Sequence, residues 1–388
     1  MGVKATAVTT ATEHDVIILG AGMAGASLAA ELAPTRRVLL LEIEAQPGRH
    51  ATGRSAAMFF ENYGNALVRA LTRCSRAFLL EPPPGFVETP LMQRRDALLF
   101  ADEPRLGRLD ALLAAPGAAG LRRIDAAAAL ARCPILRPEC VAGAVLDTSG
   151  HDIDVAALHQ AYLRRARQHG AVLAVDARSV GVQRAAGQWS VRTRDAVYRA
   201  ATVVNATGAW ADDVAAQAGV ARVGLRPLRR SALTIPAPPE HDTRGWPLVI
   251  DVDETLYFKP DAGHLLLSPA NEDDNPPCDA APDELDVAIA VDRFEKATTV
   301  AVSRVLHRWA GLRTFAADRS PVVGFDPAAE GFFWLAGQGG YGIQMAPALA
   351  RAAAALVRRE PLPADIAAEG VTIGSLSPAR WGQVLPFA

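Results

Sequence analysis

The chain has few cysteines and almost no net charge. Its 388 residues include Cys74, Cys133, Cys140 and Cys278, and no two of them form a CxxC pair. This scarcity excludes a disulfide framework and argues against a zinc ribbon or a dithiol redox centre, so we expect four reduced and mostly buried thiols. Lys and Arg number 40 and Asp and Glu 42, which gives a formal net charge of −2. A nucleic-acid binder, by contrast, usually carries a clustered basic excess.

Long hydrophobic runs are missing as well. No stretch reaches the about 18 consecutive apolar residues that a membrane-spanning helix needs. Residues 1–14 are rich in Ala and Thr without a continuous apolar run, which predicts a loose tail rather than a secretory signal, and a cytoplasmic protein. Half of all residues are nevertheless hydrophobic. That content excludes a disordered chain and is enough for the cores of two domains or of one large domain.

A glycine-rich loop near the N-terminus indicates a dinucleotide site. Residues 15–19 and 37–42 are apolar runs typical of buried parallel strands, and the segment between them favours a helix, so together they predict a βαβ unit. The loop after the first strand reads GAGMAG, the GxGxxG pattern. Gly20 allows the tight turn, Gly22 lets the backbone approach a pyrophosphate, and Gly25 lets the helix pack on the strand.

Later segments indicate how long the bound cofactor is. Glu42 ends the second strand, where its carboxylate is placed to accept hydrogen bonds from ribose hydroxyls and its charge disfavours the 2′-phosphate of NADP. The GxGxxG pattern alone does not separate NAD from FAD. Small residues also fill three later turns, at residues 52–57, 205–210 and 336–342. Such turns at the carboxyl ends of strands suit a long cofactor that lies across the edge of the sheet.

The rest of the chain shows two textures. In most of it predicted helices and strands alternate, whereas residues 225–268 show apolar runs separated by turn signals, which predicts an antiparallel meander. We predict further helices at residues 125–132, from 154 to an end at Gly170, at 283–302 and at 343–358. We predict further strands at residues 171–175, 189–193, 202–205, 309–315, 321–325 and 332–336. Because the textures interleave, the expected fold is an α/β protein with two domains that are discontinuous in sequence.

The segments GAGMAG, HATGRSAA, NATGAW, WAGLR and GQGGYGIQ, in this order, resemble the FAD-dependent D-amino acid oxidase superfamily. Within it, the chain is similar to bacterial D-amino acid dehydrogenases of the D-arginine dehydrogenase type, over nearly all of residues 15–375. The resemblance implies a Rossmann-type FAD-binding domain and a substrate domain with a mixed or antiparallel sheet, as in glutathione-reductase-like flavoproteins. The expected FAD-binding domain comprises residues 15–64, 144–214 and 320–388, and the substrate domain comprises residues 65–143 and 215–319.

The same resemblance implies non-covalent FAD and names the residues that hold it. The glycine loop would cradle the pyrophosphate, Glu42 would bind the adenosine ribose, and Val180 would meet the adenine. The late glycine-rich turn would lie near the flavin ring. The expected cofactor-binding residues are Gly20, Gly22, Met23, Ala24, Gly25, Glu42, Arg54, Ser55, Ala56, Val180, Ala206, Gly208, Gly339, Gly340, Tyr341, Gly342, Ile343 and Gln344. No residue is assigned to a metal.

The resemblance further implies an amino acid bound beside the flavin. Its carboxylate would lie on Arg230 and Arg313, because a guanidinium donates two parallel hydrogen bonds to a carboxylate. Arg229 lies next to Arg230, which leaves open which of the two faces the pocket. Tyrosine hydroxyls would bond the carboxylate or close the pocket, unless they are only core aromatics. The candidate catalytic residues are Tyr63, Tyr257, Arg230, Arg313 and Gln344; the Gln344 side chain and the Gly340 carbonyl would face the amino group.

The pocket for the substrate side chain is predicted to be apolar. Its expected residues are Met58, Phe60, Ala97, Leu248 and Ile250, with Gly340 beside them. The D-arginine type carries a histidine where this chain has Met58 and an acid where it has Ala97. Asp96 is adjacent, but neighbouring strand residues point to opposite faces. An apolar or aromatic side chain is therefore favoured, and we expect D-arginine to be a poor substrate because an unpaired buried guanidinium is costly.

The expected reaction is the oxidative deamination of a D-amino acid. Hydride passes from the Cα–H to flavin N5, and the imino acid hydrolyses to a 2-oxo acid and ammonia. The electron acceptor, whether a quinone, another carrier or O2, stays open. Three alternatives also stay open: an NAD-dependent enzyme or nucleotide-binding regulator, a catalytically inactive FAD-binding component of a pathway, and a same-family oxidase of a secondary or cyclic amine.

Overall fold

The computed structural model describes residues 12–115 and 120–381. The loose tail predicted for residues 1–14 falls mostly outside the described residues. Its last three residues belong instead to strand β1 (Thr12–Leu19), where Thr12, Glu13 and His14 pair in parallel with β12 (Val197–Asn205). That part of the prediction is wrong, because a long neighbouring strand offers these backbone groups partners that local sequence does not reveal.

The first sheet confirms the α/β class. Its strands follow the order β10 (Ser179–Ala185), β11 (Gln188–Thr193), β12, β1, β2 (Val38–Leu41) and β9 (Val172–Ala174). On the edge of β12 opposite to β1 lies β20 (Phe332–Ala336), which is parallel to β12. Strand β19 (Val322–Phe325) follows and is antiparallel to β20. The predicted βαβ unit is present as β1, helix α1 (Met23–Leu32) and β2, with β1 and β2 parallel.

Helices cover both faces of this sheet because its central strands are apolar on both sides. Val16 and Ile18 pack in one core with α1, α5 (Val155–Gln168) and α8 (Ala346–Val357). Ile17 and Leu19 pack in another core with α6 (Ala211–Gln217). Strand residues alternate between faces, so a continuous apolar run such as this one predicts burial on both.

Two predicted helices differ in length from the prediction. Helix α7 (Glu284–Ala297) ends before residue 302, because Thr298 is extended and the Thr299 N–H donates to the Ile135 carbonyl at 2.7 Å. Helix α8 begins at Ala346 rather than at residue 343, since the preceding residues form turns. Helix α5 follows the prediction closely: the Asp154 carboxylate accepts from the Ala157 N–H at 2.8 Å, and Gly170 has φ +86°.

The second sheet carries the predicted apolar runs of residues 225–268. Its order is β18 (His307–Phe315), β13 (Arg226–Pro236), β16 (His264–Ser268), β15 (Tyr257–Asp261), β14 (Leu248–Asp251), β5 (Ala97–Ala101), β7 (Gly143–Asp147) and β6 (Leu121–Asp125), with β17 (Asp273–Asp274) also on β13. The predicted meander is wrong in one respect: β13 pairs with β16 rather than with β14, and β14 is parallel to β5. Pairing with β5 brings in a segment 151 residues away, which a local pattern does not show.

Two segments lie elsewhere than the expected domain boundaries place them. Helix α2 (Ala66–Leu80) shares the core of α1 and α8, and its Ser75 Oγ accepts from the Ala348 N–H at 3.1 Å. Strand β7 lies wholly in the second sheet, although residues 144–147 were expected with the first. A small sheet of β3 (Met58–Phe59), β8 (His151–Ile153) and β4 (Met92–Arg94) is separate from both large sheets. The division into two domains otherwise stays a prediction.

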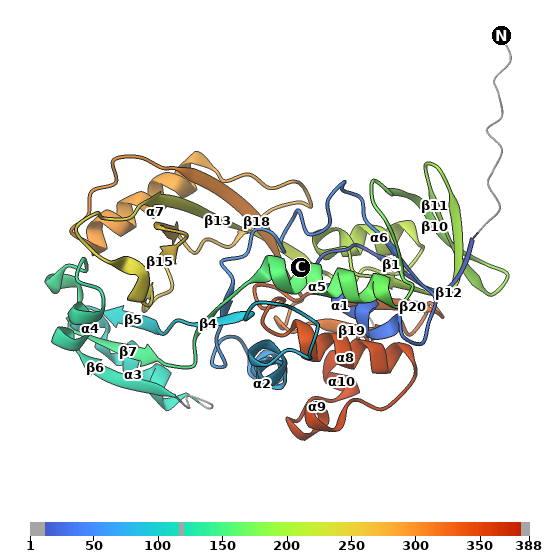
Figure 1. Ribbon diagram of the computed structural model, residues 1–388, viewed down its shortest axis with the longest axis horizontal. Helices are drawn as coiled ribbons and strands as arrows, with labels where there is room; N and C mark the ends of the chain where they lie inside the picture. The colour runs from blue at the N-terminus through green and yellow to red at the C-terminus, as the bar shows by residue number, and fades with distance from the viewer. Residues whose placement is uncertain (1–11, 116–119, 382–388) are drawn as a thin grey trace, which may run out of the picture.

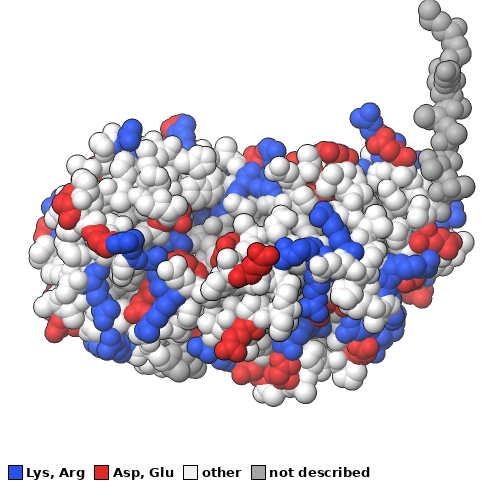
Figure 2. Space-filling model, in the orientation of Figure 1, with Lys and Arg blue, Asp and Glu red and all other residues white. Residues whose placement is uncertain are grey.

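The two large sheets occupy opposite ends of an elongated molecule, and β13 and β18 run from the second sheet towards the first (Figure 1). The remaining helices are α3 (Leu106–Ala114) and α4 (Ala126–Arg132) beside the second sheet, and α9 (Ala364–Ala368) and α10 (Ile373–Leu376) near α8. Acidic and basic side chains are interspersed over the face shown in Figure 2. Within residues 12–115 and 120–381, no helix combines the length and the apolar character needed to span a membrane. All four cysteines are free, but the prediction that they are mostly buried is wrong, because Cys133 is buried, Cys74 and Cys140 are half-buried and Cys278 is exposed.

Candidate functional site

A single cavity runs along the carboxyl edge of the first sheet and reaches β13, β15 and β18 of the second. It gathers predicted cofactor-binding residues from five separate parts of the sequence. The predicted cofactor-binding residues that line it are Gly20, Gly22, Met23, Ala24, Glu42, Arg54, Ser55, Ala56, Ala206, Gly208, Gly339, Gly340, Gly342 and Ile343. Of the predicted catalytic residues, Arg230, Tyr257 and Arg313 line the same cavity. The tertiary structure therefore places the dinucleotide motif and the paired arginines around one space.

The glycine loop has the geometry that the sequence predicted. Gly20 has φ +95°, and a Cβ there would lie 2.5 Å from the Ala206 carbonyl oxygen. A Cβ on Gly25 would lie 1.9 Å from the Gly20 carbonyl oxygen. Both positions therefore exclude side chains, Gly20 for the turn and Gly25 for close packing of helix on strand. Gly25 has this structural role and does not line the cavity.

Glu42 braces the glycine loop as well as lining the cavity. Its Oε2 accepts from the Ala21 N–H at 2.9 Å, and its Oε1 accepts from the Glu44 N–H at 3.0 Å. A carboxylate oxygen has more than one lone pair, so both oxygens keep acceptor capacity for the predicted ribose hydroxyls. Burial of Glu42, which is 6% exposed, fixes that carboxylate in place.

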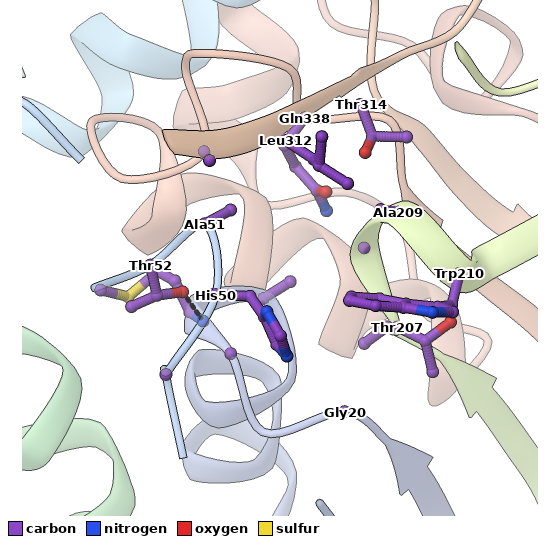
Figure 3. Close-up of a pocket in the computed structure, with 18 of the residues that line it drawn as sticks. Gly20, His50, Ala51, Thr52, Thr207, Ala209, Trp210, Leu312, Thr314 and Gln338 are labelled. Atoms are coloured by element: carbon purple, nitrogen blue, oxygen red, sulfur yellow. Dashed lines mark hydrogen bonds between the residues drawn. The ribbon is translucent and has the colours of Figure 1, made fainter. Parts of the chain in front are cut away.

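The HATGRSAA and NATGAW segments contribute residues that the sequence analysis did not single out. The Thr52 hydroxyl accepts from the Met23 N–H at 2.9 Å, the dashed line in Figure 3, and so satisfies one free donor at the start of α1. The His50 ring lies 4.8 Å from the ring of Trp210, and its Nε2 lies 2.8 Å from Glu44 Oε1. Thr52, His50 and Trp210 could have been identified from the sequence by their position inside the HATGRSAA and NATGAW motifs.

Several buried polar atoms in this cavity have no hydrogen-bond partner among the described residues. They are His50 Nδ1, Thr314 Oγ1 and Gln338 Nε2, and all three residues line the cavity. Gln338 and Thr314 lie together on one side of the space, with His50 across from Trp210 (Figure 3). Buried polar groups in native proteins are normally satisfied. Three polar atoms without hydrogen-bond partners along a glycine-lined cavity therefore suit a long ligand that has many donors and acceptors, such as a dinucleotide.

Arg54 acts as a brace between segments rather than as a free donor. Its Nη1 donates to the Ala280 and Ala310 carbonyls, each at 2.8 Å, and Nη2 pairs with Asp279. The Trp309 indole N–H in turn donates to the Arg54 carbonyl at 3.2 Å. One of these bonds satisfies a backbone carbonyl of β18, that of Ala310.

Three predicted cofactor residues lie elsewhere than expected. Val180 is 54% exposed and outside the cavity, whereas its neighbour Ser179 lines it, because adjacent strand residues face opposite ways. Tyr341 is buried off the lining with its ring 5.0 Å from that of Tyr63. Gln344 is 3% exposed, and both ends of its amide are committed: Oε1 accepts from the Phe60 N–H at 3.1 Å and Nε2 donates to Thr72 at 2.9 Å. Gln344 does not line the cavity, and its contact with a substrate amino group stays a prediction.

The register of β13 and β18 puts Arg230 and Arg313 on one face of the second sheet. Arg313 is opposite Leu228, and Arg230, two residues further along β13, is opposite Gly311. Arg229 points to the other face, where its Nε lies 3.1 Å from Asp286 Oδ2. The choice between the two adjacent arginines is thereby decided in favour of Arg230, which lines the cavity.

The two arginines have different partners. Arg230 donates from Nη2 to Glu272 Oε1 at 3.0 Å and from Nε to the Asn271 carbonyl at 2.8 Å. Among the ion pairs of the described chain, none includes Arg313. Its guanidinium lies against Gly340, where a Cβ would be 2.9 Å from Nη1. Arg313 thus lines the cavity without a carboxylate of its own; Arg178, the other lining arginine without an ion pair among the described residues, is exposed to solvent.

The surrounding groups keep Arg313 charged. Withdrawal from bulk water opposes its charge, but the nearby Tyr63, Tyr257 and Glu272 raise the pKa of Arg313 above its ordinary value. Burial alone would raise the pKa of Tyr257, yet the neighbouring Arg313 and Arg230 lower it overall. The lowered pKa of Tyr257 indicates that the two arginines favour negative charge at this end of the cavity, whereas the raised pKa of Arg313 reflects neighbours that stabilise its positive charge.

The predicted substrate-pocket residues form one apolar cluster. Its members are Met58, Phe60, Tyr63, Ala97, Leu248, Leu99, Ile250 and Tyr257. Tyr257 joins this cluster to the cavity, which the other members do not line. The Phe60 ring fills space beside Gly150, where a Cβ would lie 2.3 Å from Phe60 Cε1. The predicted apolar surroundings are present, but the side chains are packed together rather than arranged around an open pocket.

The chain is similar to flavoproteins in sequence and in fold. The family described as FAD dependent oxidoreductase (DAO) matches residues 15–356. The hydrogen cyanide synthase subunit HcnC of Pseudomonas aeruginosa is 28% identical over 228 residues, 58% of this chain and 53% of that protein. HcnC of Pseudomonas protegens is 27% identical over 63% of this chain and 58% of its own. The chain therefore matches little more than half the length of these curated relatives.

Solved structures share the fold over almost the whole chain. L-proline dehydrogenase from P. horikoshii has a TM-score of 0.80 at 20% identity and covers 96% of this chain and 98% of its own. Iminodiacetate oxidase from Chelativorans sp. BNC1 has a TM-score of 0.78 at 24% identity, covering 94% and 98%. L-α-glycerophosphate oxidase from Mycoplasma pneumoniae, solved with FAD bound, has a TM-score of 0.81 at 18% identity, covering 89% and 95%. At these identities the likeness establishes the architecture alone.

Proposed function

Because the chain belongs to the DAO family of FAD-dependent oxidoreductases, we propose that it oxidises the carbon–nitrogen bond of an amino acid. The substrate that the site favours is a D-amino acid with an apolar or aromatic side chain. The product is an imino acid that hydrolyses in solution to a 2-oxo acid and ammonia. FAD, when bound, supplies the acceptor for the hydride that leaves the substrate Cα.

One observation carries this proposal: Arg313 lines the cavity as a cation without a carboxylate partner. An enclosed charge without a partner is costly, and the cost is offset when a substrate carboxylate binds. Arg230 lies on the same face and offers a second donor. Two anchors on one carboxylate orient the substrate, because they remove its rotational freedom and direct the Cα–H one way.

The protein contributes positioning and exclusion of water. Tyr257 lies between the arginines and the apolar cluster, and its hydroxyl can donate to the same carboxylate. The cluster around Phe60 and Leu248 packs behind Tyr257 and keeps water from that end of the cavity, which strengthens the nearby charged contacts. No protein group is assigned as a general base; the amine loses its proton to water.

The surroundings of the cluster support the exclusion of basic side chains. Asp152, opposite Met58 in the small sheet, accepts from Lys259 Nζ at 2.7 Å and also pairs with Arg95. Its carboxylate is therefore already shared between two cations. Ala97 supplies no acid either. Asp147, opposite Ala97 on β7, is in no ion pair among the described residues, but it is buried and accepts hydrogen bonds from Ser149 and Asn62. A substrate guanidinium would have to displace those contacts, whereas an apolar side chain needs no counter-ion.

A secondary or cyclic amine is the second candidate, and one observation favours it. A primary ammonium group has three donors to satisfy, and the side chain expected to accept from it, Gln344, does not line the cavity and is hydrogen-bonded to Phe60 and Thr72. A secondary amine has fewer donors and would lose less in this site.

The test is flavin reduction under anaerobic conditions, which does not depend on the electron acceptor. We expect D-methionine, D-phenylalanine or D-leucine to reduce the flavin faster than D-arginine. Arg313→Met is expected to raise KM about a hundredfold or more through loss of a charge-assisted pair. Arg308→Met, on the exposed part of the same strand, is the matched control and leaves KM unchanged. A normal KM in the Arg313 variant, or faster reduction by D-arginine, contradicts the assignment, and reduction by proline or sarcosine alone favours the second candidate.

A further inference from the structure

His159 lies outside every motif described above and touches the glycine loop directly. It is on α5, which packs against α1, and is 3% exposed. Its Nε2 lies 2.8 Å from the carbonyl oxygen of Ala21, the residue between Gly20 and Gly22. Because a carbonyl can only accept, the ring carries its proton on Nε2 and donates it to the loop.

With this bond, Ala21 is hydrogen-bonded through both its N–H and its carbonyl. The Ala21 N–H donates to Glu42 Oε2 at 2.9 Å, and the Ala21 carbonyl accepts from His159. The loop at this point includes Gly20 in a left-handed conformation at φ +95°, one of several conformations open to a glycine. Two side chains from different elements, one directly after β2 and one in the middle of α5, therefore fix the two successive peptide planes on either side of the Ala21 Cα.

The same ring lies against a second segment of the cavity wall. A Cβ on Gly48 would lie 2.9 Å from His159 Cε1, and Gly48 has φ +82°. Four residues later, Thr52 accepts from the Met23 N–H at the start of α1. His159 thus stands between the glycine loop and the Gly48–Thr52 turn, the two segments that line the end of the cavity nearest to α1.

We propose that His159 is a positioning residue for the cofactor: it holds the glycine loop in the conformation that binds the FAD pyrophosphate. The energetic reason is preorganisation, since a loop that is already ordered loses less conformational freedom when the ligand binds. Burial lowers the pKa of His159 below its ordinary value, against the smaller opposing effects of the Ala21 carbonyl and Glu42. The ring is therefore neutral at pH 7, with a lone pair on Nδ1 towards Gly48. The inference does not depend on which substrate the enzyme uses.

The test measures FAD binding to apoprotein by flavin fluorescence. His159→Leu keeps an apolar volume but removes the donor, and we expect its dissociation constant for FAD to rise about tenfold, the effect of one lost buried hydrogen bond. His159→Gln carries an amide N–H near the position of Nε2 and is expected to restore the constant to within about threefold of the parent.

Two controls separate positioning from general loss of stability. Leu163→Ala removes apolar contacts from the same buried face of α5; it lowers the melting temperature of the apoprotein and leaves the dissociation constant for FAD near the parent value. Gln160→Leu alters the neighbouring exposed position and changes neither. A parent-like constant in His159→Leu overturns the proposal. Equal weakening in the Leu and Gln variants also overturns it, because packing rather than the hydrogen bond would then be responsible.

Discussion

A single missing Cβ decides how the guanidinium of Arg313 lies. The Gly340 Cα is so close that a Cβ would stand 2.9 Å from Nη1 and 3.0 Å from Cζ of Arg313. Contacts of that kind do not occur between real atoms, so the guanidinium needs glycine at this position to lie flat against the backbone. Gly340, in the late glycine-rich turn, therefore positions the Arg313 guanidinium and also lies at the predicted flavin contact.

Gly340→Ala tests this contact. We expect the new methyl group to displace the Arg313 guanidinium and to raise the substrate KM by about tenfold or more, as misplacement by a fraction of an ångström weakens a charge-assisted pair. The FAD content of the purified protein is the accompanying measurement and should stay at the parent level. Gly107→Ala, where a Cβ meets no atom within 4 Å, is the control. An unchanged KM would show that Arg313 tolerates the displacement.

The segment after β16 supplies the counter-ion of the second anchor. Glu272 Oε1 lies 3.0 Å from Arg230 Nη2 and 2.9 Å from Arg319 Nη2. Burial raises the pKa of the Glu272 carboxyl, but Arg319 and then Arg230 and Arg313 lower it overall, so the carboxylate stays charged. Strand β17 fixes the segment by pairing Asp273 with Arg229 in the backbone register. Part of the positive charge of Arg230 is therefore neutralised before any substrate binds.

Glu272→Gln removes that neutralising charge and keeps a hydrogen-bond acceptor. We expect benzoate, used as a simple carboxylate probe, to bind about three- to tenfold more tightly, because the nearby arginines lose an opposing anion. The change is read from the shift of the flavin absorbance spectrum on titration. Asp274→Asn, which affects the exposed pair with Arg226, should leave the affinity unchanged. Weaker or equal benzoate binding in the Glu272 variant would contradict the role assigned to this segment.

Carboxylate–arginine pairs join distant segments across the whole molecule. The hydrogen bonds from Arg54 and Arg49 lower the pKa of Asp279 to about 2, and this contact ties the segment after β17 to the HATGRSAA turn. At the other end of the chain, the bond from Arg351 lowers the pKa of Asp365 and ties α9 to α8. Burial acts the opposite way on Glu31 and Asp212, whose pKa values it raises.

The pairs predict how stability responds to acid. A carboxyl whose pKa is lower in the folded than in the unfolded chain stabilises the fold above its ordinary pKa, and that contribution is lost as the pH falls through the folded value. We therefore expect the free energy of unfolding, measured with urea, to be nearly constant from about pH 6 to 5 and to decrease between about pH 4 and 2. Asp279→Asn should show a smaller decrease over the same interval. A parent-like decrease in that variant would exclude Asp279 as a contributor.

Local sequence patterns were sufficient to predict those elements whose conformation depends on neighbouring residues. The apolar run at β1, the glycine loop and the start of α5 are encoded within a few positions, and the structure confirms them. The cavity also contains most of the predicted cofactor residues, because the ends of parallel strands meet at one edge of a sheet. The family resemblance predicted that Arg313 and Arg230 lie at one site, although their spacing in the sequence does not indicate it.

The sequence by itself thus determined the βαβ unit, the glycines that its turn requires and the apolar character of the cluster around Phe60. Only the tertiary structure decided which face of a strand each side chain takes, as for Ser179 instead of Val180, and which distant partner occupies a polar group. Gln344 is committed to the Phe60 N–H, 284 residues away, and His159 reaches Ala21 across 138 residues. The physical reason is that backbone conformation and apolar burial are governed by short stretches of chain, whereas a buried hydrogen bond depends on two groups that folding alone brings together.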